Sequence, residues 1–126
     1  MSKTADLRKL IREQLQTVRG TTYHKKAPPD AAYPYKTYVL KNVSFQEDRD
    51  DFDLDVDIWD RSPDQKTVEE MADQIEKLFK NANLPQETIL PTFFRENRYN
   101  LDDPDKSLQH IQLRFSVQLY EIEKEE

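Results

Sequence analysis

Apolar and acidic residues alternate near the middle of the chain more regularly than anywhere else. Between Asp50 and Asp60, apolar residues take every second position from Phe52 to Ile58, and aspartates fill the positions between them. Since successive side chains of a β-strand point to opposite faces, this period of two predicts a strand with one buried face. The other face is expected to form a row of carboxylates in water, made of Asp51, Asp53, Asp55 and Asp57.

Two segments show the three- and four-residue spacing of amphipathic helices. The first spans residues 5–19, and Gly20 follows it as a natural left-handed stop. The second begins after residues 62–64, where Thr67 and Glu70 have the spacing of a capping box, and is expected to end near residues 81–83. Residues 21–34 are rich in proline and are expected to form a long connection between the first helix and the next strand.

Three further segments are predicted to be strands. Residues 35–45 are rich in aromatic and β-branched residues, although their pattern leaves the buried face open, and residues 92–101 are less regular. Residues 108–122 alternate clearly until Leu119, after which either a bulge near Tyr120 or an outer apolar spot with Ile122 explains the lapse. Such a strand is about 45 to 50 Å long, so its end is expected to project toward another subunit.

The order of these elements is helix, hairpin, helix, hairpin. It predicts an α+β fold in which a four-stranded, mainly antiparallel sheet has two helices packed on one face. The opposite face is then open to water or to a partner. At 126 residues the chain is expected to form a single domain, 1–126.

Composition narrows the possible functions. Charged residues make up 35% of the chain, yet six Phe, six Tyr and one Trp provide the packing material that disordered chains lack. The absence of cysteine excludes disulfides, zinc-thiolate sites and thiol nucleophiles. A net charge of −6 argues against general DNA binding. Neither a signal peptide nor a membrane-spanning run is found, so a soluble protein made in a cytoplasm is expected.

No catalytic, cofactor-binding or metal-binding residue is predicted, and no cofactor. The aspartates match the opening of a calcium loop, but Val56 stands where the loop needs glycine and Ser62 where it needs glutamate. His24 and His110 have no ligand partner at helical or loop spacing. A single glycine rules out glycine-rich phosphate loops and serine nucleophile elbows.

Three segments together resemble a known family. Residues 23–40 contain an Ala-Pro-Pro and a Tyr-Pro-Tyr motif that lead into the first strand, and the acidic strand 51–60 and the closing strand 113–120 follow in order. These segments are similar to the tail-terminator, or tail-completion, proteins of long-tailed bacteriophages and prophages. The resemblance covers most of the chain.

The resemblance implies a non-enzymatic virion protein at the head-tail interface, assembled in the cytoplasm of a host bacterium. Such subunits form a ring, commonly a homohexamer, that ends the tail tube and meets the head connector. The implied partners are other copies of the chain, the major tail-tube protein and a head-completion protein. DNA is implied only as passing cargo, and no membrane is involved.

Two hypotheses about residues follow from the resemblance. The acidic row of Asp51, Asp53, Asp55 and Asp57 is expected to face the DNA channel, where like charge keeps DNA from sticking. Subunit or partner contacts are assigned to Lys25, Lys26, Tyr33, Tyr35, Arg95, Arg98 and Arg114. The simpler alternative for the three arginines is pairing across the sheet with the aspartates, and core packing is the more frequent role for Trp59 and for Phe93-Phe94.

Two other classes of function remain open at this stage. One is a stand-alone protein-binding adaptor or assembly chaperone that uses its open sheet face or an edge strand. The other is a carboxylate-dependent, metal-assisted hydrolase, which the uniform row of aspartates favours least because catalytic carboxylates need unequal environments in a cleft.

Overall fold

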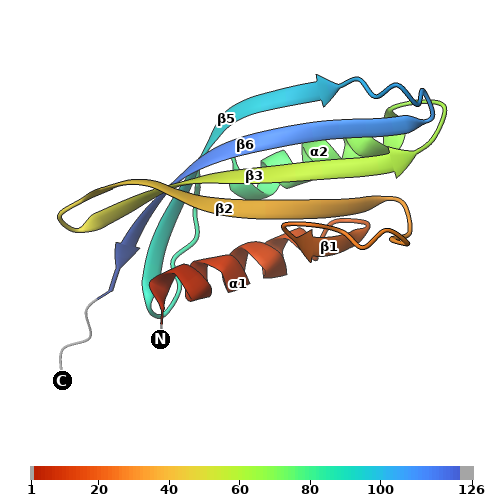
Figure 1. The fold of residues 1–126 in the computed structure, drawn as a ribbon. Helices are drawn as coiled ribbons and strands as arrows, with labels where there is room; N and C mark the ends of the chain where they lie inside the picture. Colours follow the sequence, from red (N-terminus) through yellow and green to blue (C-terminus); the bar gives the residue numbers. More distant parts are fainter. Residues whose placement is uncertain (1, 123–126) are drawn as a thin grey trace.

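The computed structural model describes residues 2–122 as one sheet of six strands with two helices. In chain order the elements are α1 (Lys3–Leu15), β1 (Thr21–His24), β2 (Tyr35–Gln46), β3 (Arg49–Arg61), α2 (Lys66–Phe79), β4 (Ala82–Asn83), β5 (Ile89–Leu101) and β6 (Leu108–Glu121). The strand order is β1-β2-β3-β6-β5-β4. Figure 1 shows that the long strands twist and curl, with α1 beside β2 and α2 behind β3 and β6.

The predicted four-stranded, mainly antiparallel sheet is wrong, because two short strands extend the sheet at its edges. β1 lies in the segment expected to be a loop and pairs with β2 in parallel, from Thr21 opposite Tyr35 to His24 opposite Tyr38. β4 has two residues and pairs with β5. The sheet is therefore mixed and six-stranded. Strands of two and four residues are too short to show a period of two, so the sequence pattern does not reveal them.

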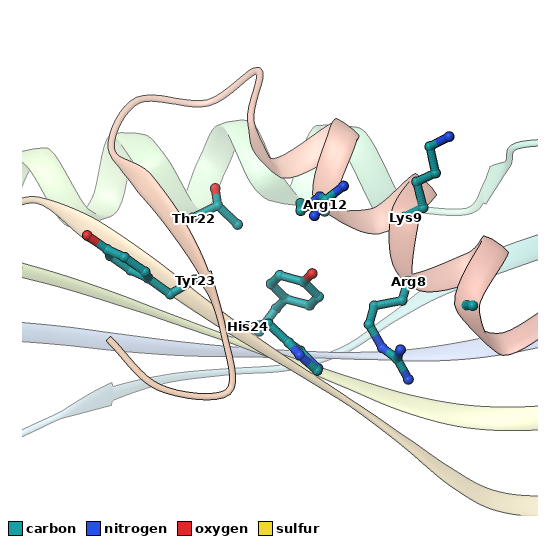
Figure 2. Close-up of a pocket in the computed structure, with 8 residues that line it drawn as sticks. Arg8, Lys9, Arg12, Thr22, Tyr23 and His24 are labelled. Atoms are coloured by element: carbon teal, nitrogen blue, oxygen red, sulfur yellow. The ribbon is translucent and has the colours of Figure 1, made fainter. Parts of the chain in front are cut away.

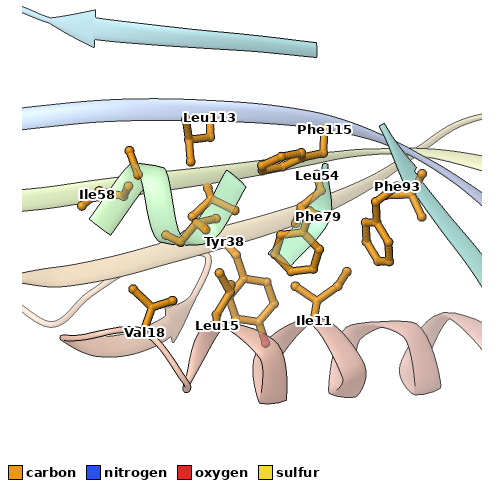
Figure 3. Close-up of a cluster of buried hydrophobic side chains, with 14 of the residues drawn as sticks. Ile11, Leu15, Val18, Tyr38, Leu54, Ile58, Phe79, Phe93, Leu113 and Phe115 are labelled. Carbon is orange, nitrogen blue, oxygen red and sulfur yellow. The ribbon is translucent and has the colours of Figure 1, made fainter. Parts of the chain in front are cut away.

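Both helices pack against one side of the sheet and share one apolar core. Figure 3 shows Ile11 and Leu15 of α1 meeting the same cluster as Phe79 of α2. The ring centre of Phe79 lies 4.8 Å from that of Phe93 and 5.4 Å from that of Phe115. Burial of each such side chain stabilises the fold by about 1.5 to 3 kcal/mol. The predicted buried rows are confirmed and comprise Phe52, Leu54, Val56 and Ile58 of β3 and Ile111, Leu113, Phe115, Val117 and Leu119 of β6.

A buried lysine ties the end of the first helix to the sheet. α1 ends at Leu15, earlier than predicted, and the chain turns through Gly20, whose φ is +90°. Lys36 on β2 is fully buried, and its ammonium group donates hydrogen bonds to the carbonyl oxygens of residues 18, 19 and 20. These three acceptors have left the regular helix and need donors, so Lys36 acts as their cap. Burial lowers the pKa of Lys36 to about 8.

The second helix does not begin with the predicted capping box. Its N-cap residue is Gln65, which makes no side-chain bond to the helix, and Thr67 already lies inside the helix. A carboxylate oxygen of Asp64 instead accepts a hydrogen bond from the backbone N–H of Lys66 at 3.0 Å. The turn formed by residues 62–64 thus supplies the acceptor that the sequence spacing had placed three residues later.

Two irregularities in the sheet lie elsewhere than the sequence indicates. β6 pairs with β3 without a break as far as Tyr120, so no bulge occurs there. The register shifts instead between Asn42 and Ser44 in β2 and between Arg95 and Asn97 in β5. Because a bulge adds one residue, it changes which side chains share a face.

No helix within residues 2–122 is long and apolar enough to cross a membrane.

Candidate functional site

The sheet face turned away from the core, here called the outer face, carries the aspartate row on β3. β3 lies between β2 and β6, so each aspartate has a neighbour on either side. On β6, Asp53 lies opposite Ser116, Asp55 opposite Arg114 and Asp57 opposite Gln112. The polar side chains of two central strands therefore form one continuous surface.

Asp55 is the most protected member of the row. Only 6% of the residue is exposed, although it lies on the outer face. Arg114 covers it with two hydrogen bonds, from Nε to Oδ1 at 2.7 Å and from Nη2 to Oδ2 at 3.1 Å. The hydrogen bonds to Asp55 raise the pKa of Arg114. The cross-strand pairing considered for Arg114 is thus present.

The other aspartates differ from one another in their partners. Asp51 lies 2.8 Å from Nε of Arg49 and accepts a hydrogen bond from the Ser44 hydroxyl at 2.9 Å. Oδ1 of Asp57 lies 2.6 Å from Nε2 of His110. Asp53 alone has no ion pair or hydrogen bond from its side chain within residues 2–122. The expected uniform row of carboxylates in water is therefore wrong, because three of the four are engaged by the subunit's own side chains.

Beyond Asp57, the side chains on the outer face are aromatic rings. The Trp59 ring stacks on the His110 ring, with 3.5 Å between ring centres. On the other side of Trp59, the ring centre of Tyr35 lies 6.4 Å from that of Trp59. Tyr35 also contacts Tyr23 and Tyr33, at 5.9 and 5.3 Å between ring centres. We call these five residues the aromatic strip. Trp59 is thus an outer-face residue and not the core residue that frequency favoured, whereas Phe93 is in the core.

One pattern in the sequence indicates the position of Trp59 in the aromatic strip. Trp59 is two residues beyond Asp57, so the period of two places it on the outer face with the aspartates. The other rings come from separate segments of the chain. Tyr35, Trp59 and His110 meet through the pairing of β2 with β3 and of β3 with β6. Tyr23 joins them through the parallel pairing of β1 with β2, which no pattern in the sequence predicts.

The loop after β1 borders this surface. A hollow of about 380 Å³ is lined by Lys25, Lys26, Ala27, Tyr35, Thr37, Asp57 and Trp59. Four of the residues assigned to contacts therefore lie at one end of the outer face, since Tyr33 packs on Tyr35. Lysines, a carboxylate and aromatic rings in one hollow suit contact with another macromolecule better than chemistry on a small substrate.

Arg95 and Arg98 lie on the other side of the sheet, against α2. Arg95 forms an ion pair with Glu76 at 3.0 Å, and Arg98 pairs with Glu76 at 3.0 Å and with Asp73 at 2.8 Å. The idea that they pair with the aspartates of β3 is wrong. The bulge in β5 explains their common side, because residues three apart would otherwise point to opposite faces.

No group of three or more possible metal ligands occurs within residues 2–122.

Comparisons with known proteins agree with this picture of an assembly surface. The chain matches the family model described as tail completion protein gp17 over residues 5–120. Among 28 matching solved chains, one comes from the virion of a native gene transfer agent particle. It is 12% identical, with a TM-score of 0.63, and the match covers 88% of this chain and 84% of that one. A second solved chain, known by a sequence designation alone, is 12% identical with a TM-score of 0.74, over 98% and 99% of the two chains. No curated protein matches the chain.

Proposed function

This chain belongs to the tail completion protein gp17 family and is a structural protein of a phage tail, and on that premise we propose that it forms a ring that ends the tail tube and joins it to the head connector. The observation that carries the proposal is the family match over residues 5–120, nearly the whole chain. A non-enzymatic role accords with the assembly described by the family name. The proposed partners are other copies of the chain, the tail-tube protein and a head-completion protein.

Within this ring, we assign the two ends of the outer face to different tasks. The end with the aromatic strip and the lysine loop makes contacts between subunits. Aromatic side chains bring large contact areas at low cost in conformational entropy, and Tyr33 is 39% exposed in the single subunit. Lys25 and Lys26 add charges that orient the approach of a neighbour.

The end with the acidic row approaches the channel for DNA. Since Arg49, Arg114 and His110 already contact three of the aspartates, Asp53 supplies the carboxylate that remains free to repel phosphate. The compensated pairs leave a polar wall with a small negative charge. The basic side chains of this wall are held by the aspartates, so they offer passing DNA little to bind.

Tube termination can be tested with the tail-tube protein encoded in the same genome. Purified tube protein is polymerised with and without this chain, and tube lengths are measured by negative-stain electron microscopy. The proposal expects shorter tubes that carry a ring of density at one end. Unchanged tube lengths with no ring at either end would overturn it.

A matched pair of variants separates a specific cap from nonspecific inhibition. Tyr33→Ala with Tyr35→Ala is expected to abolish capping, while Lys77→Gln with Lys80→Gln on and after α2 leaves it intact. Binding to some other phage protein with no effect on tubes would instead favour an adaptor.

A further inference from the structure

A groove between α1 and β1 gathers positive charge on a chain whose net charge is −6. The groove, here called the basic groove, has a volume of about 420 Å³; α1 contributes Arg8, Lys9 and Arg12 to its lining, and His24 comes from β1. Figure 2 shows Arg8 extending from α1 toward His24, with Lys9 and Arg12 on the same helix. Tyr38 of β2 lies beneath, its ring centre 5.1 Å from that of His24. The basic groove is separate from the outer-face hollow.

The cations that α1 contributes to the basic groove form no ion pair within residues 2–122. No carboxylate of residues 2–122 forms an ion pair with Arg8, Lys9 or Arg12. Two buried polar atoms, Nε of Arg8 and Oγ1 of Thr22, also have no hydrogen-bond partner in this part of the chain. Burying a polar atom without a partner costs free energy, and an anionic ligand with hydrogen-bond acceptors would remove this cost.

The backbone beside the groove limits which anion fits. β1 is the first strand in the sheet order, so its outer edge has no neighbouring strand among the described residues. An extended peptide can add to such an edge through its own N–H and C=O groups, which a nucleic acid lacks. A strand edge without a neighbouring strand, beside a group of cations, therefore favours an acidic peptide over DNA.

We propose that the basic groove binds an acidic segment from a second copy of this chain, residues 123–126, which follow the end of β6. This inference rests on the proposed ring, in which each subunit presents two different surfaces to its two neighbours. Contacts of this kind need complementary surfaces on one molecule. A basic groove and an acidic segment supply them.

The sequence favours residues 123–126 over the other acidic segments. They contain three glutamates and one lysine, so the segment carries a net charge of −2. The loop near Asp103 and Asp105 is also acidic, but Arg61 and Ser107 already bind the carboxylate of Asp105. Asp103 in turn accepts a hydrogen bond from the backbone N–H of Asp105. Residues 47–48, the turn between β2 and β3, offer only two carboxylates.

Docking can be measured on the whole subunit without any ring. A fluorescein-labelled peptide with the sequence of residues 123–126, blocked at both ends, is titrated with the protein and followed by anisotropy. Arg8→Gln with Arg12→Gln is expected to weaken binding by about tenfold or more, since two charge-assisted contacts are lost. Lys77→Gln with Lys80→Gln removes the same charge far from the groove and is expected to change the affinity less than about twofold, the range of nonspecific screening.

The ionisation of His24 gives a second readout that a folding defect cannot imitate. Burial, Arg8 and Lys25 lower the pKa of His24. The groups that face it are Arg8 and Arg12 from α1, Lys25 beyond β1 and Tyr38 from β2. A docked acidic peptide is expected to raise this pKa in an NMR titration of the wild-type protein, and so to bind more tightly at pH 6 than at pH 8.

The outcomes separate this inference from the ring proposal. Equal peptide affinity for both double variants, or an unchanged His24 titration, would overturn docking in the groove. Loss of duplex DNA binding in the Arg8/Arg12 variant, with no peptide binding by the wild type, would overturn it in favour of a phosphate site. Peptide binding that depends on the groove supports the inference even if tube lengths fail to change, in which case the ring proposal alone falls.

Discussion

Arg114 on β6 and Asp55 on β3 form a two-point hydrogen-bonded pair in which the acid is buried and the base is not. The side chain of Asp55 is 9% exposed and that of Arg114 is 38% exposed. The two partners therefore depend on each other unequally. If Asp55 is removed, water can hydrate the exposed guanidinium group of Arg114. If Arg114 is removed, little water can reach the buried carboxylate of Asp55.

Removal of Arg114 is expected to destabilise the protein more than neutralisation of Asp55. Arg114→Met leaves a buried carboxylate without its main partner and is expected to cost about 2 to 3 kcal/mol, whereas Asp55→Asn costs about 1 kcal/mol. Urea unfolding followed by circular dichroism gives both values. The exposed pair of Arg61 and Asp105 is the control, and Arg61→Met is expected to change stability less than Arg114→Met. The opposite order for Arg114 and Asp55 would contradict the assigned burial.

Replacement of Gly20 is expected to strain the turn between α1 and β1. Its φ of +90° is unfavourable for residues with a side chain, and an added Cβ would lie 2.9 Å from the carbonyl oxygen of Pro34. Gly20→Ala should therefore lower the free energy of unfolding by about 1 to 3 kcal/mol. The exposed Gln16 serves as a control in the same turn. If Gly20→Ala and Gln16→Ala have equal effects in thermal unfolding, the turn is not as closely packed as described.

The buried Lys36 predicts a rise in stability at alkaline pH. The pKa is about 8 in the folded protein, below the ordinary value of 10.5, so between these limits the unfolded chain binds more protons than the folded one. The free energy of unfolding therefore increases with pH across this window, by up to about 3 kcal/mol. This gain is fully present only above pH 10.5 and is lost as the pH falls through 8.

The Lys36 effect is isolated by comparison with Lys36→Met, which cannot titrate. Wild-type stability minus variant stability, from urea unfolding at pH 7, 8, 9 and 10, should increase along the series. Tyrosines that ionise at higher pH affect both proteins alike and cancel in this difference. A difference that stays constant over the series would mean that the lysine is not desolvated.

The aromatic strip is expected to control association of subunits. Tyr33→Ala with Tyr35→Ala removes two rings that pack on each other, and ring formation measured by light scattering should weaken. Phe45→Ala is the matched control, because Phe45 is 79% exposed at the tip of the hairpin and makes no ring contact among the described residues. An intact ring in the double variant would remove these tyrosines from the interface.

Neutralising the acidic row is expected to increase DNA retention by the assembled ring. With asparagine at residues 51, 53, 55 and 57, the wall loses its negative charge and the remaining cations can meet phosphate. Asp53→Asn alone should give much of the effect, since no side chain of residues 2–122 forms an ion pair or a hydrogen bond with its carboxylate. DNA affinity of the ring and the rate of DNA release from particles are the measurements. If both stay at wild-type values in the fourfold variant, the row does not face the channel.

Sequence reasoning succeeded where one strand has one buried face. In residues 52–58 and 111–119, successive side chains face the core and the surface in turn, and apolar and polar residues alternate in the same way. Both buried rows could therefore be predicted from the sequence. It failed where structure depends on long-range pairing. β1 forms because the chain returns through residues 25–34 to place β2 beside it, and neither strand encodes this alone.

The candidate site shows the same division. The shared face of the aspartates followed from their spacing, but their separate environments did not, because Arg114 and His110 come from a strand more than fifty residues away. One bulge in β5 places Arg98 on the core side of the sheet together with Arg95, away from the other contact residues. A single inserted residue reverses every later assignment along a strand, and local composition gives no sign of it.

The acidic row also has a consequence for the folding chain before any partner is met. If β3 slipped by one residue against β2 and β6, its aspartates would enter the core and its apolar residues would face water. An ionised carboxylate costs several kcal/mol to bury, so burying four of them would use up the roughly 5 to 15 kcal/mol that stabilises a typical domain. The nearest misaligned sheet is therefore too costly to persist, and the aspartates make correct alignment of the central strand a condition of folding at all.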